Sequence, residues 1–274
     1  SIDDSSGVSE ANQGKFLGLT ETGTKTAGGK PTALDHMINL GVTHLHLIPV
    51  YDYGSVDESK LDTPQFNWGY DPKNYNVPEG SYSTNPYDGA VRIREMKEMV
   101  KTLHENNINV VMDVVYNHVY DAGTFCFNEI VTNYFSRTYP DGTYSSDSGC
   151  GNDTASERSM VSKYIVDSVC YWADEYHIDG FRFDLAVTVA RETTPYVFNS
   201  FETHGTFFKA VNADPIISKC ILIGEPWDIG GYGYRVGQFP PAWSEQNDKY
   251  RDTVRSFWRG DLGCMGEFAT RLLG

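Results

Sequence analysis

The chain has 274 residues, 40% of them hydrophobic and 14% aromatic, which suffices for one large domain or two small domains with a sizeable core. Its formal net charge of −15 argues against nucleic acid or an anionic membrane as a partner, whereas a neutral sugar polymer is not repelled. No apolar run approaches the roughly 18 residues that span a bilayer, so no membrane partner is expected. The chain starts at Ser1 without a recognisable leader, which leaves its compartment, secreted or cytoplasmic, open.

Apolar runs of strand length alternate along the chain with segments of helical periodicity. The expected strands are 42–50, 109–115, 179–185, 220–225 and 254–258, and the expected helices are 31–40, 87–107, 156–176, 198–211 and 267–273. Asn85 is the expected N-cap of the second helix. The alternation predicts an α/β fold in which helical crossovers join the strands of a parallel sheet.

One stretch interrupts this alternation. Residues 120–153, between the strand 109–115 and the helix 156–176, are rich in Gly, Asn, Asp, Ser and Thr. We interpret them as a long excursion or small subdomain over the functional face, within a single domain that spans residues 1–274.

Two carboxylates lie at the carboxyl ends of expected strands, namely Asp184 in Gly180–Asp184 and Glu225 in Ile223–Asp228. Barrel enzymes keep their sites at the carboxyl ends of the strands, and retaining glycosidases need two carboxyl groups about 5 Å apart. Asp184 is therefore the candidate nucleophile and Glu225 the candidate acid and base. A partly desolvated site with a second carboxylate nearby is expected to raise the pKa of Glu225.

Other polar residues gather near the same strand ends. Arg182 precedes Asp184 by two residues, so both face one side of the strand, and the cation is expected to keep the aspartate ionised. Asp113 can hold an arginine in place, and His118 can donate a hydrogen bond to a sugar hydroxyl. Tyr70, in the motif 67–72, is expected to stack on a sugar ring, whereas Trp68 is as readily a core residue.

Together the stretches 113–118, 180–184 and 224–228 resemble three signature regions of the α-amylase superfamily of glycoside hydrolases, and motifs 67–72, 77–86 and 149–158 are similar to those of its type I pullulanases. The resemblance implies a (β/α)8 barrel and cleavage of α-1,6 bonds. It implies these roles: catalytic, Asp184 and Glu225; substrate-binding, Tyr70, Asp71, His118, Arg182 and Trp227; structural support, Asp113 and Asn117. No organic cofactor is implied. Calcium is possible near Asn117 and the Asp-rich loop, without diagnostic spacing.

The closer likeness changes along the chain. Up to about Asp184 the sequence resembles type I pullulanases, whereas 237–243 and 250–261 look more like glycogen debranching enzymes and isoamylases. Two explanations are open: a chimaera joined near residues 184–189, or a natural intermediate subfamily. Both groups cut α-1,6 bonds, so the expected bond type is the same under either explanation.

The resemblance also has a gap. The superfamily's third catalytic aspartate follows a histidine on the seventh strand, and none of the seven histidines here precedes an aspartate. We therefore expect an incomplete barrel containing about strands two to six, with exposed sheet edges. We expect this polypeptide alone to be unstable, prone to associate or inactive.

The expected activity is retaining hydrolysis of α-1,6-glucosidic branch bonds in pullulan, amylopectin or glycogen-type α-glucans. Two alternatives remain: an α-1,4-acting amylase-type hydrolase, and a non-catalytic α-glucan-binding fragment. Comparing the hydrolysis of pullulan with that of linear amylose distinguishes the first alternative from the expected activity. Glucan binding without release of reducing ends identifies the second.

Overall fold

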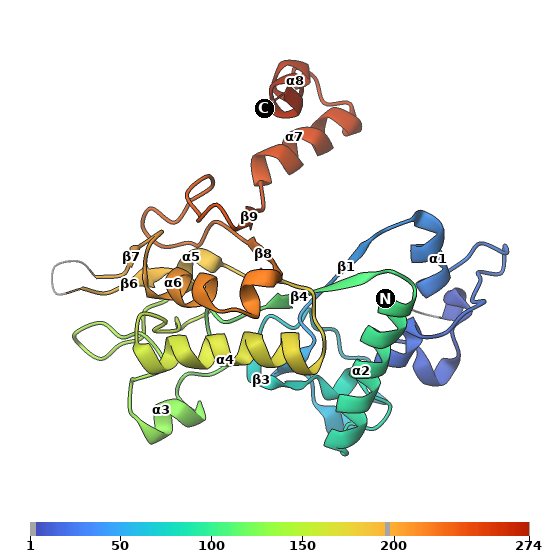
Figure 1. Cartoon of the computed structure of the whole chain (residues 1–274), viewed down its shortest axis with the longest axis horizontal. Coiled ribbons are helices and arrows are strands. Elements are labelled where there is room, and N and C mark those ends of the chain that lie inside the picture. The colour runs from blue at the N-terminus through green and yellow to red at the C-terminus, as the bar shows by residue number, and fades with distance from the viewer. Residues whose placement is uncertain (1–3, 195–197, 274) are drawn as a thin grey trace.

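The computed structural model describes residues 4–194 and 198–273 and contains strands and helices in alternation (Figure 1). The strands are β1 (His44–Leu47), β2 (Tyr51–Tyr53), β3 (Pro72–Pro78), β4 (Asn109–Val114), β5 (Gly180–Phe183), β6 (Arg191–Glu192), β7 (Ser200–Phe201), β8 (Ile221–Gly224) and β9 (Ser244–Glu245). The helices are α1 (Ala33–Leu40), α2 (Gly89–Glu105), α3 (Cys126–Ile130), α4 (Ser159–Glu175), α5 (Ala186–Val189), α6 (Thr206–Ala213), α7 (Asp248–Arg259) and α8 (Met265–Leu273). No helix in this described part is long and apolar enough to cross a membrane.

The central sheet has five strands in the order β1-β4-β5-β8-β9, and every neighbouring pair is parallel. Spatial order equals chain order, as in consecutive strands of a (β/α)8 barrel. The expected α/β fold and incomplete barrel are thus confirmed. Because the strands are parallel, their carboxyl ends share one edge of the sheet, and the residues that follow each strand meet there.

An aromatic core joins the long helices to the sheet. Trp172 on α4 is fully buried, donates its Nε1 proton to the carbonyl of Tyr75 at 2.9 Å, and packs 4.6 Å from the ring of Tyr176. Tyr51 and Tyr116 are also buried in this cluster. Large rings bury more apolar area than any other side chain, so this cluster packs α4 against β3 and the end of β4.

One expected strand is wrong. Residues 254–258 lie inside α7, because Asn247 caps that helix by accepting from the Tyr250 amide at 2.9 Å and Gly260 ends it at φ 85°. The β-branched and aromatic residues of 254–258 favour a strand, but the helix caps at Asn247 and Gly260 outweigh this local propensity. The fifth strand is instead β9, whose residues Ser244–Glu245 pair with β8.

Two helix starts also differ from the expectation. The cap of α2 is Asp88, which accepts from the Ala90 amide at 2.9 Å, whereas Asn85 closes a turn by accepting from Tyr87. The segment 198–211 is not one helix, since Ser200–Phe201 form β7 and α6 begins only at Thr206. The other expected helices and strands are present with shifted ends.

The chain departs from the sheet in two places. Residues 120–153 include α3, and the chain rejoins the body where the Thr154 amide donates to the carbonyl of Asn117 at 2.9 Å. Helices α7 and α8 pack against each other and project away from the rest of the chain (Figure 1). Neither helix contains a buried residue, although the rings of Phe257 and Phe268 stack at 3.8 Å.

The aromatic core gives a first prediction. Replacing Trp172 by alanine should lower the free energy of unfolding by about 3–5 kcal/mol, because a buried ring and its hydrogen bond are lost. The matched control is Trp258→Ala, since Trp258 is 77% exposed and should change stability by no more than about 0.5 kcal/mol. Urea denaturation measures both variants. Equal losses in the two would contradict this description of the core.

Candidate active site

The two candidate carboxylates lie side by side at the carboxyl edge of the sheet. Asp184 follows β5 and Glu225 follows β8, two strands that pair with Phe183 opposite Gly224. Backbone bonds connect their ends, since the Glu225 amide donates to the Phe183 carbonyl at 3.0 Å. Leu185, in the left-handed region at φ 38°, donates its amide to Glu225 Oε2 at 2.9 Å. This conformation is unfavourable for a side chain of that size, so the structure holds the turn between the two carboxylates under strain.

Arg182 connects the acidic side chains of three strands. Its Nη1 lies 2.9 Å from Asp113 Oδ1 and 2.8 Å from Asp184 Oδ1, and its Nη2 lies 2.9 Å from Glu225 Oε2. The expected contact of Arg182 with Asp184 is present, and Arg182 is the arginine that Asp113 contacts. Burial opposes the charge of this arginine, yet Asp113, Glu225 and Asp184 together raise its pKa, so it stays a cation.

Glu225 has the ionisation behaviour that a general acid needs. Burial raises its pKa, Arg182 opposes that rise, and the neighbouring carboxyl of Asp184 adds to it, giving a value of about 7. Its ordinary value is 4.5, so Glu225 keeps its proton in a pH range where an exposed glutamate has lost it. The expected upward shift is therefore present, and desolvation is its main cause.

Asn117 and His118, which follow β4, are buried against the nucleophile candidate. Asn117 donates its amide to Asp184 Oδ2 at 2.9 Å and faces the His118 ring with its oxygen. His118 Nε2 lies 3.0 Å from the Tyr70 carbonyl, and burial lowers the pKa of this histidine. Both ring nitrogens thus have protein partners here, and a direct contact of His118 with a sugar stays a prediction.

The motif 67–72 reaches the carboxylates through one side chain. Tyr70 donates its hydroxyl to Asp113 Oδ2 at 2.9 Å, which places its ring beside the Arg182 cluster. Asp71 accepts from the Ser55 amide at 2.7 Å and from the Asn67 amide group at 3.0 Å. Its carboxylate thus fixes the loop, and substrate binding by Tyr70 or Asp71 stays a prediction. Trp68 is 63% exposed and is not a core residue.

A small hollow adjoins Glu225 and includes residues that the sequence analysis missed. Its volume is about 320 Å³, and Trp227 lines it together with Gln246 and Arg251 from the segment that begins α7. Gln246 Oε1 accepts from Arg182 Nε at 3.2 Å and from Nη2 at 3.1 Å. No sequence motif marks this glutamine, because its contact depends on the pairing of β9 with β8.

A buried ion pair supports the loop that carries Glu225 and Trp227. Arg191 donates through Nε and Nη2 to the two oxygens of Asp228, at 2.7 Å each, and the Asp228 side chain is fully buried. Asp228 lies three residues after Glu225, so the pair fixes the loop next to the candidate acid. Sequence reasoning missed Arg191, although an aspartate within the motif 223–228 hinted at a cationic partner.

Calcium near Asn117 stays a prediction. The nitrogen and the oxygen of the Asn117 side-chain amide both have protein partners here. Within the described residues, one cluster of three carboxylates could share a cation. It consists of Asp52, Glu58 and Glu79, whose oxygens lie within 4.8 Å of one another. Arg92 already contacts Glu58 and lies 3.8 Å from Asp52. A protein cation thus compensates part of this negative charge.

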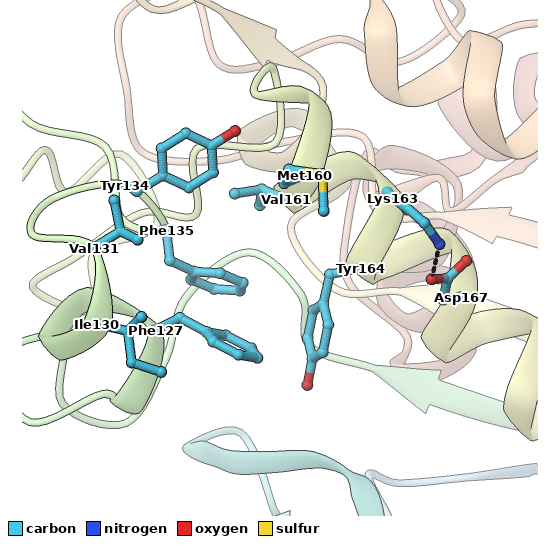
Figure 2. A pocket seen from close by; sticks show the side chains of 10 residues that line it. All are labelled: Phe127, Ile130, Val131, Tyr134, Phe135, Met160, Val161, Lys163, Tyr164 and Asp167. Carbon is cyan, nitrogen blue, oxygen red and sulfur yellow. Dashed lines mark hydrogen bonds and ion pairs between the residues drawn. The ribbon is translucent and has the colours of Figure 1, made fainter.

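The excursion forms an apolar hollow with α4. In Figure 2 the rings of Phe127, Phe135 and Tyr164 gather between α3 and α4, with Ile130 and Met160 at the rim. Its volume is about 540 Å³, and the one ion pair drawn beside it joins Lys163 to Asp167. A sugar needs hydrogen-bonding groups around its hydroxyls, so this apolar hollow suits an apolar side chain better than a glucan.

The buried ion pair gives a second prediction. Replacing Asp228 by alanine should lower the free energy of unfolding by about 3–5 kcal/mol, because Arg191 is left buried without its main partner. The control is Asp252→Ala, whose partner Arg251 is exposed, and it should cost no more than about 1 kcal/mol. Chemical denaturation of both variants tests this difference, and a loss of similar size in the two would contradict it.

Comparison with known proteins agrees with this geometry. Residues 20–145 match the family model described as the catalytic domain of alpha amylase. The pullulanase of Bacillus subtilis (strain 168) is 45% identical over 230 residues, which are 84% of this chain and 30% of that protein. The "Glycogen operon protein GlgX homolog" of Mycobacterium bovis is 39% identical over 259 residues, 92% of this chain and 35% of that protein.

Solved structures give the same result. The pullulanase of Paenibacillus barengoltzii, in its complex with maltohexaose and alpha-cyclodextrin, superposes with a TM-score of 0.80 at 43% identity. That match covers 92% of this chain and 38% of the pullulanase chain. The chain therefore spans about a third of the length of the relatives it matches. Motifs, fold and relatives agree: the chain belongs to the α-amylase family and is related to its debranching enzymes.

Proposed function

We propose that this protein takes part in the retaining hydrolysis of α-1,6-glucosidic branch bonds in α-glucans such as pullulan. The observation that carries the proposal is the placement of Asp184 and Glu225 on neighbouring nitrogens of one buried guanidinium. Such a pair is close, as the roughly 5 Å spacing of retaining enzymes requires, whereas inverting enzymes leave room for a water between their carboxyl groups.

The two carboxyl groups divide the reaction between them. Asp184 attacks the anomeric carbon, while Glu225 gives its proton to the leaving glycosidic oxygen. Water then attacks the glucosyl-enzyme, Glu225 takes the proton from that water, and the bond to Asp184 breaks. A pKa of about 7 suits Glu225 to both proton transfers near neutral pH. No step needs an organic cofactor.

Relatives support the choice of bond and polymer. Both the Bacillus subtilis protein and the Paenibacillus barengoltzii structure are named pullulanase, and the latter is a complex with maltohexaose. From these relatives we infer that the substrate of the present chain is also an α-glucan. The motif 67–72, whose Tyr70 contacts Asp113 in the site, favours the α-1,6 bond over the α-1,4 bond.

The proposal predicts that this chain, within a longer protein that supplies the superfamily's third catalytic aspartate, releases reducing sugars from pullulan. Glu225→Gln and Asp184→Asn should each lower this rate by about a thousandfold or more, since each removes one half of a cooperating pair. The control Asp167→Asn alters an exposed carboxylate on α4 and should keep the rate. A reducing-end assay on pullulan and on linear amylose measures both bond types.

Two results would contradict the proposal. Pullulan hydrolysis that survives Glu225→Gln would exclude Glu225 as the acid. Faster hydrolysis of amylose than of pullulan would assign the chain to α-1,4 bonds instead.

A further inference from the structure

A second hollow opens at the same edge of the sheet as the carboxylates. Its volume is about 610 Å³, and its lining includes residues 13–15 and residues 63–68. Ile48, the residue that follows β1, also lines it. Because β1 and β5 run in the same direction, residues that follow β1 lie at the edge that carries Asp184. The hollow therefore opens on the catalytic face.

Two exposed aromatic rings stand at this hollow. Phe66 is 85% exposed and Trp68 is 63% exposed, and their ring planes meet at 79° with centroids 6.1 Å apart. Large apolar rings in water are unfavourable, and a pair of them beside a hollow marks a binding surface rather than a core. Two nearly perpendicular rings offer two faces, on which successive rings of a bent glucan can rest.

The hollow is also polar enough for a sugar. Gln13, Lys15 and Asn67 line it together with the aromatic groups. Lys15 is anchored by donating to the Ser81 carbonyl at 2.8 Å, and Asn67 by donating to Asp71 at 3.0 Å. A saccharide presents apolar C–H faces and hydroxyl edges, so it needs this mixture of rings and fixed polar groups. The apolar hollow of Figure 2 lacks that mixture.

A short turn connects this hollow to the catalytic groups. The Gly69 amide donates to Asn67 Oδ1 at 2.7 Å. Gly69 has a φ of 87°, and a Cβ at this position would lie 2.9 Å from the Pro49 carbonyl oxygen, so the turn requires glycine. On one side of this glycine, Trp68 lines the hollow. On the other side, Tyr70 reaches Asp113 in the Arg182 cluster.

We propose that the hollow at Phe66 and Trp68 is a glucan-binding subsite that extends the active-site cleft and holds sugar units remote from the bond being cut. It rests on the proposed function for the identity of its ligand. Because the sugar is neutral, binding depends on stacking and hydrogen bonds rather than on the net charge of the chain. The subsite should favour long linear glucans over short ones.

The test is calorimetric titration of maltose and maltohexaose into the full chain carrying Glu225→Gln, which prevents turnover. Adding Trp68→Ala should weaken maltohexaose binding about tenfold, the loss expected when an aromatic anchor is truncated, and should leave maltose binding unchanged. Trp68→Tyr keeps an aromatic face and should retain most of the affinity. The control Trp258→Ala truncates a more exposed tryptophan on α7, and it should leave the binding of both sugars unchanged.

Several outcomes would overturn the subsite. These are equal maltohexaose affinities in folded Trp68→Ala and Trp258→Ala proteins, the same loss for maltose as for maltohexaose, and the absence of saturable maltohexaose binding before any change at Trp68. A change in self-association by sedimentation with unaltered sugar affinity would assign the rings to a protein contact instead. Reducing-sugar release by the parent and by Glu225→Gln decides the proposed function separately.

Discussion

The buried guanidinium of Arg182 is the group on which the site depends. A cation at 6% exposure is costly to bury unless its charge and its donors are satisfied, and here Asp113, Asp184, Glu225 and Gln246 surround it. These partners come from β4, from the residues after β5 and β8, and from the residue after β9. The requirement to compensate one charge therefore holds the carboxyl ends of four neighbouring strands together.

The same arrangement separates the roles of two chemically similar side chains. Asp184 receives a hydrogen bond from Asn117 and an ion pair from Arg182, both of which favour a negative oxygen. Burial and the charge of Asp184 favour the protonated form of Glu225, so the pKa of Glu225 rises to about 7. Environment, not residue type, thus makes one carboxyl suited to attack and the other suited to proton transfer.

Much of this could be predicted from the sequence, because short motifs at strand ends place their residues at one edge of a parallel sheet whatever the loops do. The placement of Asp184, Glu225 and Arg182 at that edge follows from this rule. Features that depend on pairing between distant segments could not be predicted. Gln246 reaches Arg182 only because β9 joins the sheet, and residues 254–258 fold as a helix because caps outweigh strand propensity. The exposure of Trp68 could not be predicted either, because it depends on the path of the loop that carries this residue.

The most direct test of the account is a carbon-13 NMR titration of the Glu225 carboxyl, assigned by its loss in Glu225→Gln. The account predicts a midpoint of about 7, with the proton bound below that pH and lost above it, and a lower midpoint in Asp184→Asn, where the neighbouring negative charge is gone. A midpoint near 4.5, or one that Asp184→Asn leaves unchanged, would contradict the coupling of the two carboxyl groups on which the proposed chemistry rests.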